Sequence, residues 1–462
     1  MKSFKKKVRC FLVVILSVGF NTSVNARTLY VAVDGDDNNN GKTEETAFRS
    51  LQKAADVVQP GDVVYLGNGD YTNDDKYDGG AVLRIHRSGK PNAWISWKAL
   101  PGTHPTIRPV GWAGVSITAS YEIIDGITIL GANDSINLLA ALTDAKNKTP
   151  NPLYNTNGIT IDGRKNSPYQ KPHHIIIKNS TVGKCPGGGI TILEADYVIV
   201  EDCKVFENAW YMRYAGSGIT TLNNWAFDDS PGYHMVIQRN YVWDNKTLVP
   251  WEKTGKLSDG NGILIDVTDL KKNGATNPNA DVAVVTKHQS ENLLPEKQKN
   301  MQRPEWKGRA LIANNLSAFN GGSGIHVFRT KYVDIINNTT YWNGQTVGYQ
   351  ELFANNSEDI IFLNNIIVPR PGGKVTSNNK NKNIRWDYNL YPNEQQVFKG
   401  EKDIIADPLF IKIDKDLRKA NFKLSKNSKG INSGIDEIPQ PYDIQRTKRP
   451  KKSIRDRGAF EQ

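Results

Sequence analysis

The chain has 462 residues, a formal net charge of +11 and three cysteines. So few cysteines exclude a small disulfide-stabilised scaffold, and the length is sufficient for a large buried core. There is no glycine-rich phosphate loop, no Gly-x-Ser-x-Gly elbow and no His-Glu-x-x-His helix. The sequence therefore lacks the signatures of P-loop NTPases, of serine hydrolases with a nucleophile elbow and of zincin peptidases.

Residues 1–26 are predicted to be a secretory signal peptide. A basic amino end is followed by an apolar stretch at 10–20 and by small residues before Arg27. That stretch is short for a membrane span, and no other segment is long or apolar enough to cross a bilayer. We therefore expect a secreted or periplasmic monomer. Removing the five basic residues of this segment leaves a net charge of +6.

Residues 27–110 are predicted to form an amino-terminal cap and the first coils of a solenoid. A strand begins at Tyr30, and residues 47–56 carry apolar side chains at helical spacing. A turn and a second strand follow at 60–66. A strand, a helix and a strand suit a cap, because a solenoid must cover the open end of its first coil.

Residues 111–410 are predicted to form an all-β, right-handed parallel β-helix. Four copies of Gly-x-Gly-Ile each open a short alternating strand, and apolar strands ending in asparagine lie between them. Aligning Ile177 with Val200 gives a period of about 23 residues, which is typical of a solenoid. Asparagine tolerates the left-handed conformation, so asparagines at successive corners are expected to stack in a hydrogen-bonded ladder.

Two segments interrupt the period, at 246–258 and 271–307, and both flank the strand at 259–266. Insertions in a solenoid gather on its binding face, so these segments indicate where a site lies. Residues 411–462 are predicted to form a terminal coil and a solvated basic tail. The mild positive charge also suits a polyanionic partner, although no nucleic-acid partner is expected. Cys185 and Cys203 fall at different coil positions, which leaves a disulfide open, and they lack metal-ligand spacing.

The residues 30–37 and 47–56, together with 406–410, 421–424 and 457–461, resemble secreted bacterial β-helix proteins of the pectate lyase-like superfamily, including family 9 pectate lyases. The resemblance implies a long groove for a polysaccharide. In the lyases it implies β-elimination with calcium and a basic residue, so Ca²⁺ is a candidate cofactor.

The catalytic motifs of family 9 are not closely matched. The family's aspartates are mostly replaced in Asp259-Gly-Asn-Gly262 and in the Gly-Ser-Gly of 322–324. The strand that holds the family's lysine reads Gly348-Tyr-Gln-Glu351. No metal ligand is therefore assigned from the resemblance.

The outer face of the repeated strands carries the candidate catalytic residues. Residues alternate in and out along a strand, so with Ile263 and Ile325 inward, Asp266 and His326 point outward from neighbouring coils. Arg329 follows just beyond the second strand. The histidine is expected to transfer a proton near neutral pH, the arginine to neutralise a substrate carboxylate, and the aspartate to fix the tautomer or to bind a cation. The alternative is a surface histidine stacked on Phe328.

Other residues are expected to reach the same groove. Glu351 of the following coil completes the catalytic candidates. The candidate substrate-binding residues are Asp162, Tyr211, Arg213, Trp251, Asp259 and Asn261. Exposed aromatic rings such as that of Trp251 are common platforms for sugar rings.

With a polysaccharide as the partner, three alternative functions of the protein remain. The first is a lyase that cleaves an acidic, uronate-containing polysaccharide by β-elimination. The second is a glycoside hydrolase, which requires two carboxylates, here Asp266 with Glu351 or Asp162. The third is a glycan-binding or surface-interaction β-helix without catalysis.

Overall fold

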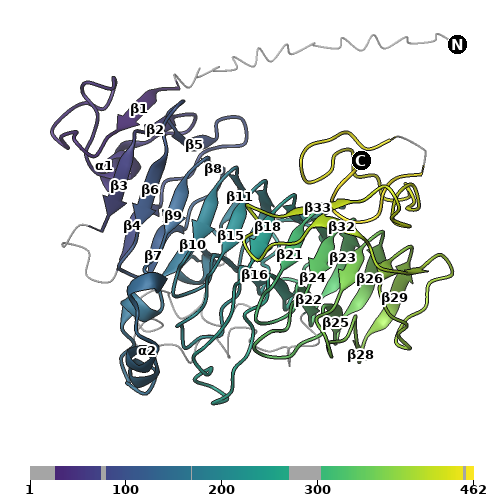
Figure 1. The fold of residues 1–462 in the computed structure, drawn as a ribbon. Helices are drawn as coiled ribbons and strands as arrows, with labels where there is room; N and C mark the ends of the chain where they lie inside the picture. The colour runs from purple at the N-terminus through teal and green to yellow at the C-terminus, as the bar shows by residue number, and fades with distance from the viewer. Residues whose placement is uncertain (1–25, 74–79, 168, 270–302, 451–453) are drawn as a thin grey trace, which may run out of the picture.

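The computed structural model describes residues 26–73, 80–167, 169–269, 303–450 and 454–462. The predicted signal peptide and most of the 271–307 insertion lie outside these ranges. Figure 1 shows a long stack of parallel strands, with the carboxyl-terminal segment lying beside its far end.

The described strands form three long sheets, here named A, B and C. Sheet A has the spatial order β1 (Thr28–Val31), β2 (Val63–Leu66), β5 (Ile95–Ala99), β8 (Glu122–Asp125), β11 (His173–Lys178), β14 (Asp196–Glu201), β17 (Tyr233–Gln238), β20 (Arg309–Ala313), β23 (Lys331–Ile336), β26 (Glu358–Leu363) and β29 (Lys382–Asp387). Sheet B has the order β3 (Gly69–Thr72), β6 (Pro105–Arg108), β9 (Thr128–Leu130), β12 (Thr181–Gly183), β15 (Lys204–Phe206), β18 (Tyr241–Trp243), β21 (Leu316–Ala318), β24 (Thr339–Tyr341), β27 (Ile366–Val368), β30 (Leu390–Tyr391) and β31 (Ile404–Ile405). Sheet C contains β4 (Ala81–Ile85), β7 (Ala113–Ile117), β10 (Asn157–Asp162), β13 (Ile190–Leu193), β16 (Ile219–Leu222), β19 (Ile263–Asp266), β22 (Ile325–Phe328), β25 (Leu352–Asn355) and β28 (Asn378–Asn379).

Away from the ends of the stack, each coil takes one strand from sheet A, one from sheet B and one from sheet C, and each strand pairs in parallel with its equivalent in the next coil. Ile177 lies opposite Val200, as the period predicts. The predicted all-β parallel β-helix is therefore confirmed.

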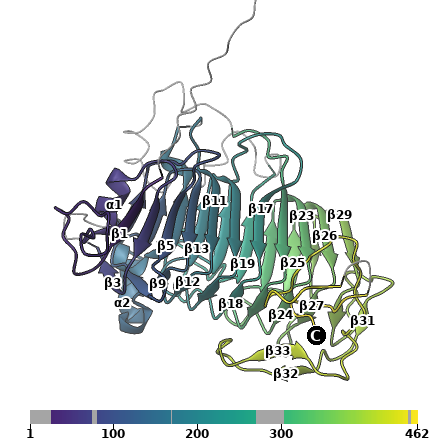
Figure 2. The same ribbon diagram turned by 90° about the horizontal axis from the view of Figure 1, so that it is seen from above.

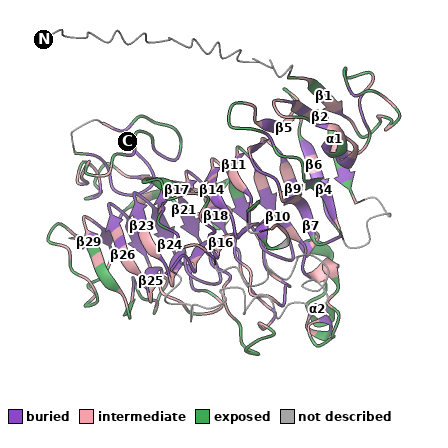
Figure 3. Ribbon diagram, turned by 180° about the vertical axis from the view of Figure 1, so that it is seen from behind, coloured by how far each residue is buried: buried purple, intermediate pink, exposed green. Residues whose placement is uncertain are grey.

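The core is a set of stacked apolar columns inside the coils. Ile190, Ile219, Ile263 and Ile325 are partners in successive strands of sheet C, and each is fully buried. Figure 3 shows the same burial along the strands of the stack. β-Branched side chains suit these positions because they pack well on a pleated surface, and each buried isoleucine contributes roughly 1.5–3 kcal/mol.

Two asparagine ladders run along the corners of the coils, as predicted. In each, the side-chain amide donates to the Oδ1 of the asparagine in the next coil. The ladder between sheets A and B joins Asn240, Asn315, Asn338, Asn365 and Asn389 with N···O distances of 3.0–3.1 Å. The ladder between sheets B and C joins Asn208, Asn245, Asn320 and Asn343 at 2.7–3.0 Å.

The Asn-Asn pairs divide their roles at the corner between sheets A and B. Asn314, Asn337 and Asn364 adopt φ values of 55°, 55° and 58°, and the asparagine after each joins the ladder. A left-handed residue turns the chain sharply, and asparagine accepts that conformation more readily than most side chains do.

The amino-terminal end has β1, α1 (Leu51–Val57) and β2 in the order expected for the cap. Ser50 caps α1 by accepting a hydrogen bond from the Lys53 amide at 3.1 Å. Phe48, Leu51, Ala54 and Ala55 are buried, which covers the end of the core. The short helices η1 (Asn133–Ser135), α2 (Leu138–Asp144) and η2 (Pro152–Tyr154) form an insertion between β9 and β10 that the sequence did not predict, and η3 (Gly163–Lys165) follows β10.

The carboxyl-terminal segment differs from the prediction in two ways. β32 (Phe410–Lys412) and β33 (Asn421–Leu424) form an antiparallel hairpin, so residues 421–424 are not part of a further coil. Part of the tail is buried rather than solvated: Arg449 and Arg455 are 2% exposed and form ion pairs with Glu461 and Asp436, whereas Arg446 and Lys448 are exposed. The reason is that the tail packs back on the corner between sheets A and B, where the guanidinium of Arg449 donates to Asn314.

Cys185 and Cys203 are both buried and unbridged. Burial raises the pKa of each thiol to about 12, so both are inert at neutral pH. Within the described ranges, no helix has the length and apolar character needed to cross a membrane.

Candidate functional site

The candidate site lies on the outer face of sheet C. Leu264 pairs with His326 and Asp266 with Phe328 across β19 and β22, which places Asp266 and His326 on neighbouring coils with one step of offset along the strand. This is the arrangement that the strand alternation predicts. The loops at the corner between sheets B and C, including 246–258, border this face.

Asp266 and Arg329 form the central ion pair of the site. Arg329 follows β22 in the left-handed region, with φ at 51°, and its Nε and Nη2 lie 3.2 Å and 3.0 Å from the two oxygens of Asp266. Desolvation raises the pKa of Asp266, while the Arg329 charge opposes that rise. The guanidinium therefore favours an ionised carboxylate in surroundings that otherwise disfavour charge.

His326 is held by aromatic rings rather than by polar partners. Its ring lies 4.1 Å from that of Phe353 and 5.6 Å from that of Phe328, and neither ring nitrogen has a hydrogen-bond partner among the described residues. Burial, and then the Arg329 charge, lower its pKa to about 3. A pKa this low keeps the imidazole neutral near pH 7 and makes it a poor proton carrier there, so the proton-transfer role of His326 stays a prediction. It is stacked mainly on Phe353, and it is 8% exposed rather than lying open on the surface.

Asp259 is the group whose pKa is raised to about 7. The main cause is desolvation, to which the negative charge of Asp266 adds, while hydrogen bonds from Ser258 and Asn261 and the charge of Arg329 oppose the rise. The Ser258 hydroxyl donates to Asp259 at 2.8 Å, and the Asn261 amide donates at 3.3 Å. A carboxyl group with such a pKa is suited to donate a proton in neutral solution.

The backbone at Asp259 is set by a tight approach between loops. Asp259 and Gly260 adopt φ values of 63° and 69°. A Cβ on Gly260 would lie 2.8 Å from the Lys246 Cα, so only glycine fits there. Asn261 then fixes the strand start, because its amide contacts Ser217 and its Oδ1 accepts from Ser323 at 2.8 Å. Asn261 is fully buried, so its place is beneath Asp259 rather than against a substrate.

Ser258 and Tyr349 join the site although the sequence did not single them out. The Tyr349 hydroxyl lies 3.4 Å from the Ser258 Oγ, and the Tyr349 ring is 5.9 Å from that of His326. A signal for Tyr349 was present, because it lies in the segment 348–351 of the next coil. The contact with Ser258 joins residues 91 positions apart, and no local pattern indicates it.

Glu351 does not lie on the outer face. It is 1% exposed and accepts from both the backbone and the side-chain nitrogens of Asn343, so it ends an asparagine ladder inside the stack. Desolvation raises its pKa to about 8. The prediction that Glu351 is a catalytic group reached by substrate disagrees with this burial.

The other predicted substrate-binding residues lie away from Asp266. Asp162 is on β10, three strands distant in sheet C, and pairs with Arg164 at 2.8 Å. Tyr211 is 7% exposed in an apolar cluster with Ala141 of α2.

Arg213 is bound to the protein itself, because its Nε lies 2.7 Å from Glu252 and its Nη1 donates to the Asn147 carbonyl. Trp251 is partly exposed in the 246–258 loop, where its backbone pairs with that of Lys256. The Lys253 ammonium lies 5.6 Å from the centre of the Trp251 ring.

The site does not fit a calcium ion. Across the part of the chain that the structure describes, no group of three or more His, Cys, Asp or Glu side chains is arranged to hold a metal. Calcium prefers several oxygen ligands, whereas Asp266 is engaged by the guanidinium of Arg329. We therefore propose no metal ion in the reaction.

Comparisons with known proteins show the fold. Pectate lyase Pel9A is 16% identical to this chain and superposes with a TM-score of 0.52. The match covers 94% of this chain and 96% of Pel9A. XylC in complex with xylose is 12% identical over 94% and 98% of the two chains, with a TM-score of 0.46. A rhamnogalacturonan lyase is 14% identical over 87% and 97%, with a TM-score of 0.43. No protein-family model matches the chain, and no curated protein matches it. The chain thus shares the parallel β-helix fold of Pel9A.

Proposed function

We propose that this parallel β-helix protein is a carbohydrate-active enzyme that hydrolyses glycosidic bonds in a polysaccharide. The observation that carries the proposal is a pair of carboxyl groups with different surroundings, Asp259 in the loop before β19 and Asp266 at the end of β19. Asp259 has neutral hydrogen-bond donors and a pKa of about 7, whereas Asp266 is paired with Arg329. Carboxyl groups held in contrasting environments divide the roles of acid and base.

In this proposal Asp259 is the general acid. It donates its proton to the glycosidic oxygen as the bond to the anomeric carbon breaks, and Asp266 takes a proton from the attacking water. The oxygen of that water forms the new bond to the anomeric carbon, so the protons and electrons balance. The charge of Arg329 opposes the desolvation that raises the pKa of Asp266, and so favours the ionised form that the base role requires.

The neutral side chains of the site are suited to bind the sugar. His326 has an N–H donor and a lone pair without a partner in the described protein, and both nitrogens are buried, so a sugar must displace part of their cover to reach them. Tyr349 lies beside both His326 and Ser258. The shared fold with Pel9A, a pectate lyase, supports an extended polysaccharide as the partner.

Elimination from a uronate is a weaker match to the same residues. The His326 pKa of about 3 makes the imidazole a poor base at neutral pH. Arg329, which would neutralise the substrate carboxylate, is already bidentate on Asp266. An enzyme that used these two residues for elimination would need both of them free for the substrate.

The experiment is to incubate the purified protein with neutral and acidic polysaccharides and to follow both reducing ends and the ultraviolet absorbance of unsaturated uronates. We expect new reducing ends without that absorbance, and their loss in Asp259→Asn and Asp266→Asn. New ultraviolet absorbance would instead establish elimination. Polysaccharide binding without turnover, unchanged by either substitution, would establish a binding protein.

A further inference from the structure

A second cleft, of about 590 Å³, lies between the outer face of sheet B and the carboxyl-terminal segment. Tyr241 and Trp243 of β18 and Leu316 of β21 form its floor, and residues 417, 418 and 420–423 form a wall. Figure 2 shows the hairpin of β32 and β33 outside the stack, on the side of β18 and β24. The Asp259 cluster lies on sheet C, so the two sites occupy different faces.

The charged groups of this cleft are all positive. Its lining contains Lys204, Arg418 and Lys423 and no acidic residue. Arg418 is bound to Asp416 at 2.7 Å and lies over the Phe206 ring at 5.1 Å. Neither Lys204 nor Lys423 pairs with an acidic side chain of the described chain, so both ammonium groups are available to an anion.

The uncharged lining is of the kind that binds sugar rings. Asn421 and Gln445 supply amides that donate and accept hydrogen bonds, and Tyr241 supplies a hydroxyl over an apolar floor. Burial raises the pKa of Tyr241 to about 12, so the phenol stays protonated and neutral. Apolar surface with a few polar groups of fixed position is typical of small-ligand sites.

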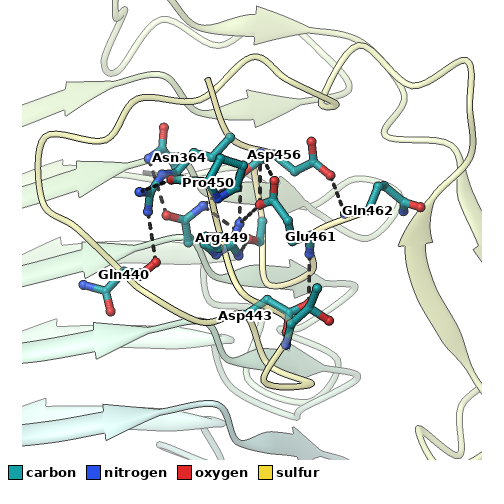
Figure 4. Close-up of polar contacts among 12 residues, drawn as sticks. Asn364, Gln440, Asp443, Arg449, Pro450, Asp456, Glu461 and Gln462 are labelled. Carbon is teal, nitrogen blue, oxygen red and sulfur yellow. Dashed lines mark hydrogen bonds and ion pairs between the residues drawn. The ribbon is translucent and has the colours of Figure 1, made fainter. Parts of the chain in front are cut away.

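The wall is held in place before any ligand arrives. Figure 4 shows Arg449 at the centre of a polar network in the tail. Its Nη1 donates to Glu461 at 2.6 Å, its Nη2 donates to Asn314 at 2.9 Å, and the Gln462 amide donates to the carbonyl of Leu424 in β33. A preformed site loses little conformational freedom on binding, which favours affinity.

We propose that this cleft is a binding site for an anionic saccharide, a sugar ring that carries a carboxylate or a sulfate. Lys204 and Lys423 contact the oxyanion, and the amides and Tyr241 contact the hydroxyl groups. The site holds an acidic glycan on sheet B while the reaction face on sheet C stays open. This inference rests on the cleft alone and does not depend on the hydrolytic activity.

The test is calorimetric titration with a short oligogalacturonate, a sulfated disaccharide and a neutral oligosaccharide of matched length. The protein carries Asp259→Asn and Asp266→Asn, so no turnover accompanies binding and the result is independent of catalysis. We expect Lys204→Glu and Lys423→Glu each to weaken binding of an anionic sugar by about 10-fold or more. Lys419→Glu, an exposed change of equal charge on the same loop outside the cleft, should leave it unchanged.

The outcomes distinguish a carboxylate from a sulfate as the bound group, and they include results that would overturn the proposal. Binding of the oligogalacturonate alone assigns a carboxylate, and binding of the sulfated sugar alone assigns a sulfate. An equal loss in all three lysine variants would overturn the proposal, because it would reflect general surface charge. Binding of the neutral sugar with equal affinity, or no binding of any sugar, would overturn it as well.

Discussion

The side-chain amide of Asn343 donates to a carboxyl oxygen of Glu351, and this contact ends the ladder between sheets B and C. Each asparagine of a ladder donates to the next, so the last one needs an acceptor. Asp403 ends the other ladder, where its carboxyl oxygen accepts from the backbone amide of Asn389 at 2.8 Å. A carboxyl group therefore caps each asparagine column, and Glu351 is a structural residue.

Replacing Glu351 with glutamine tests this role. Glutamine adds an N–H where Asn343 donates, so we expect a loss of about 1–3 kcal/mol in the free energy of unfolding. The folded-state pKa of Glu351 is raised to about 8, so its contribution is full below the unfolded pKa and is lost as pH rises through about 8. Urea unfolding at about pH 5 and about pH 8 should show the difference between the two proteins narrowing at the higher pH. A constant difference would contradict the raised pKa.

Asp259→Asn should lower kcat/KM for polysaccharide hydrolysis by about 100-fold or more, because the general acid is lost. In the unmodified enzyme, activity should fall as pH rises through about 7, since Asp259 must be protonated. A pH–rate profile of each protein measures the loss of kcat/KM in the variant and the fall of activity with pH in the unmodified enzyme. Asp70→Asn, an exposed carboxyl group on sheet B, is the matched control and should keep the profile.

Arg329→Gln removes the charge that favours ionised Asp266. The desolvation of Asp266 then acts without opposition from Arg329, so its pKa should rise further. The acidic limb of the pH–rate profile should move to higher pH, and by more than the alkaline limb that belongs to Asp259, on which the Arg329 charge also acts. Equal movement of both limbs would show that Arg329 acts on the whole site rather than on Asp266.

His326→Phe separates a binding role from a proton-transfer role. The ring stack on Phe353 is kept, so the melting temperature should change little. We expect KM to rise by about 10-fold through lost hydrogen bonds to the sugar, with kcat and the pH–rate profile nearly unchanged. A kcat reduced by about 100-fold would instead identify His326 as a proton carrier.

Asp196→Asn should destabilise the corner between sheets C and A. The Asp196 carboxylate lies 3.0 Å from the buried His234 Nδ1 and accepts from the Trp306 indole at 2.9 Å. Breaking such a buried pair costs about 3–5 kcal/mol, which urea unfolding measures. Asp229→Asn is the exposed control, because the Asp229 ion pair with Lys307 is exposed at the surface.

The pair of Asp196 and His234 also predicts that the stability of the fold depends on pH. Desolvation lowers the pKa of His234, but Asp196 and the Ser230 carbonyl outweigh it and the net direction is upward. Stability from the charged pair is therefore full below the unfolded histidine pKa and is lost as pH rises through the folded value. Asp196→Asn should remove this slope, and an unchanged slope would contradict the assignment.

The sequence by itself determined the solenoid, its register and its outward faces. Ile177 pairs with Val200 and Asp266 lies one step from His326 because strand alternation and asparagine corners are local features that repeat with the coil. A period of short strands leaves few other ways to bury its isoleucines. The site could be located to β19 and β22 for the same reason.

Only the tertiary structure decided what those side chains do. Ser258 meets Tyr349 across 91 residues, and Arg449 meets Asn314 across 135, and no periodic pattern encodes such contacts. Protonation likewise depends on burial and neighbouring charge. For that reason the pKa of Asp259 is raised to about 7, while the pKa of His326 is lowered to about 3. The proposed reaction chemistry rests on those surroundings, which the loops and later coils supply.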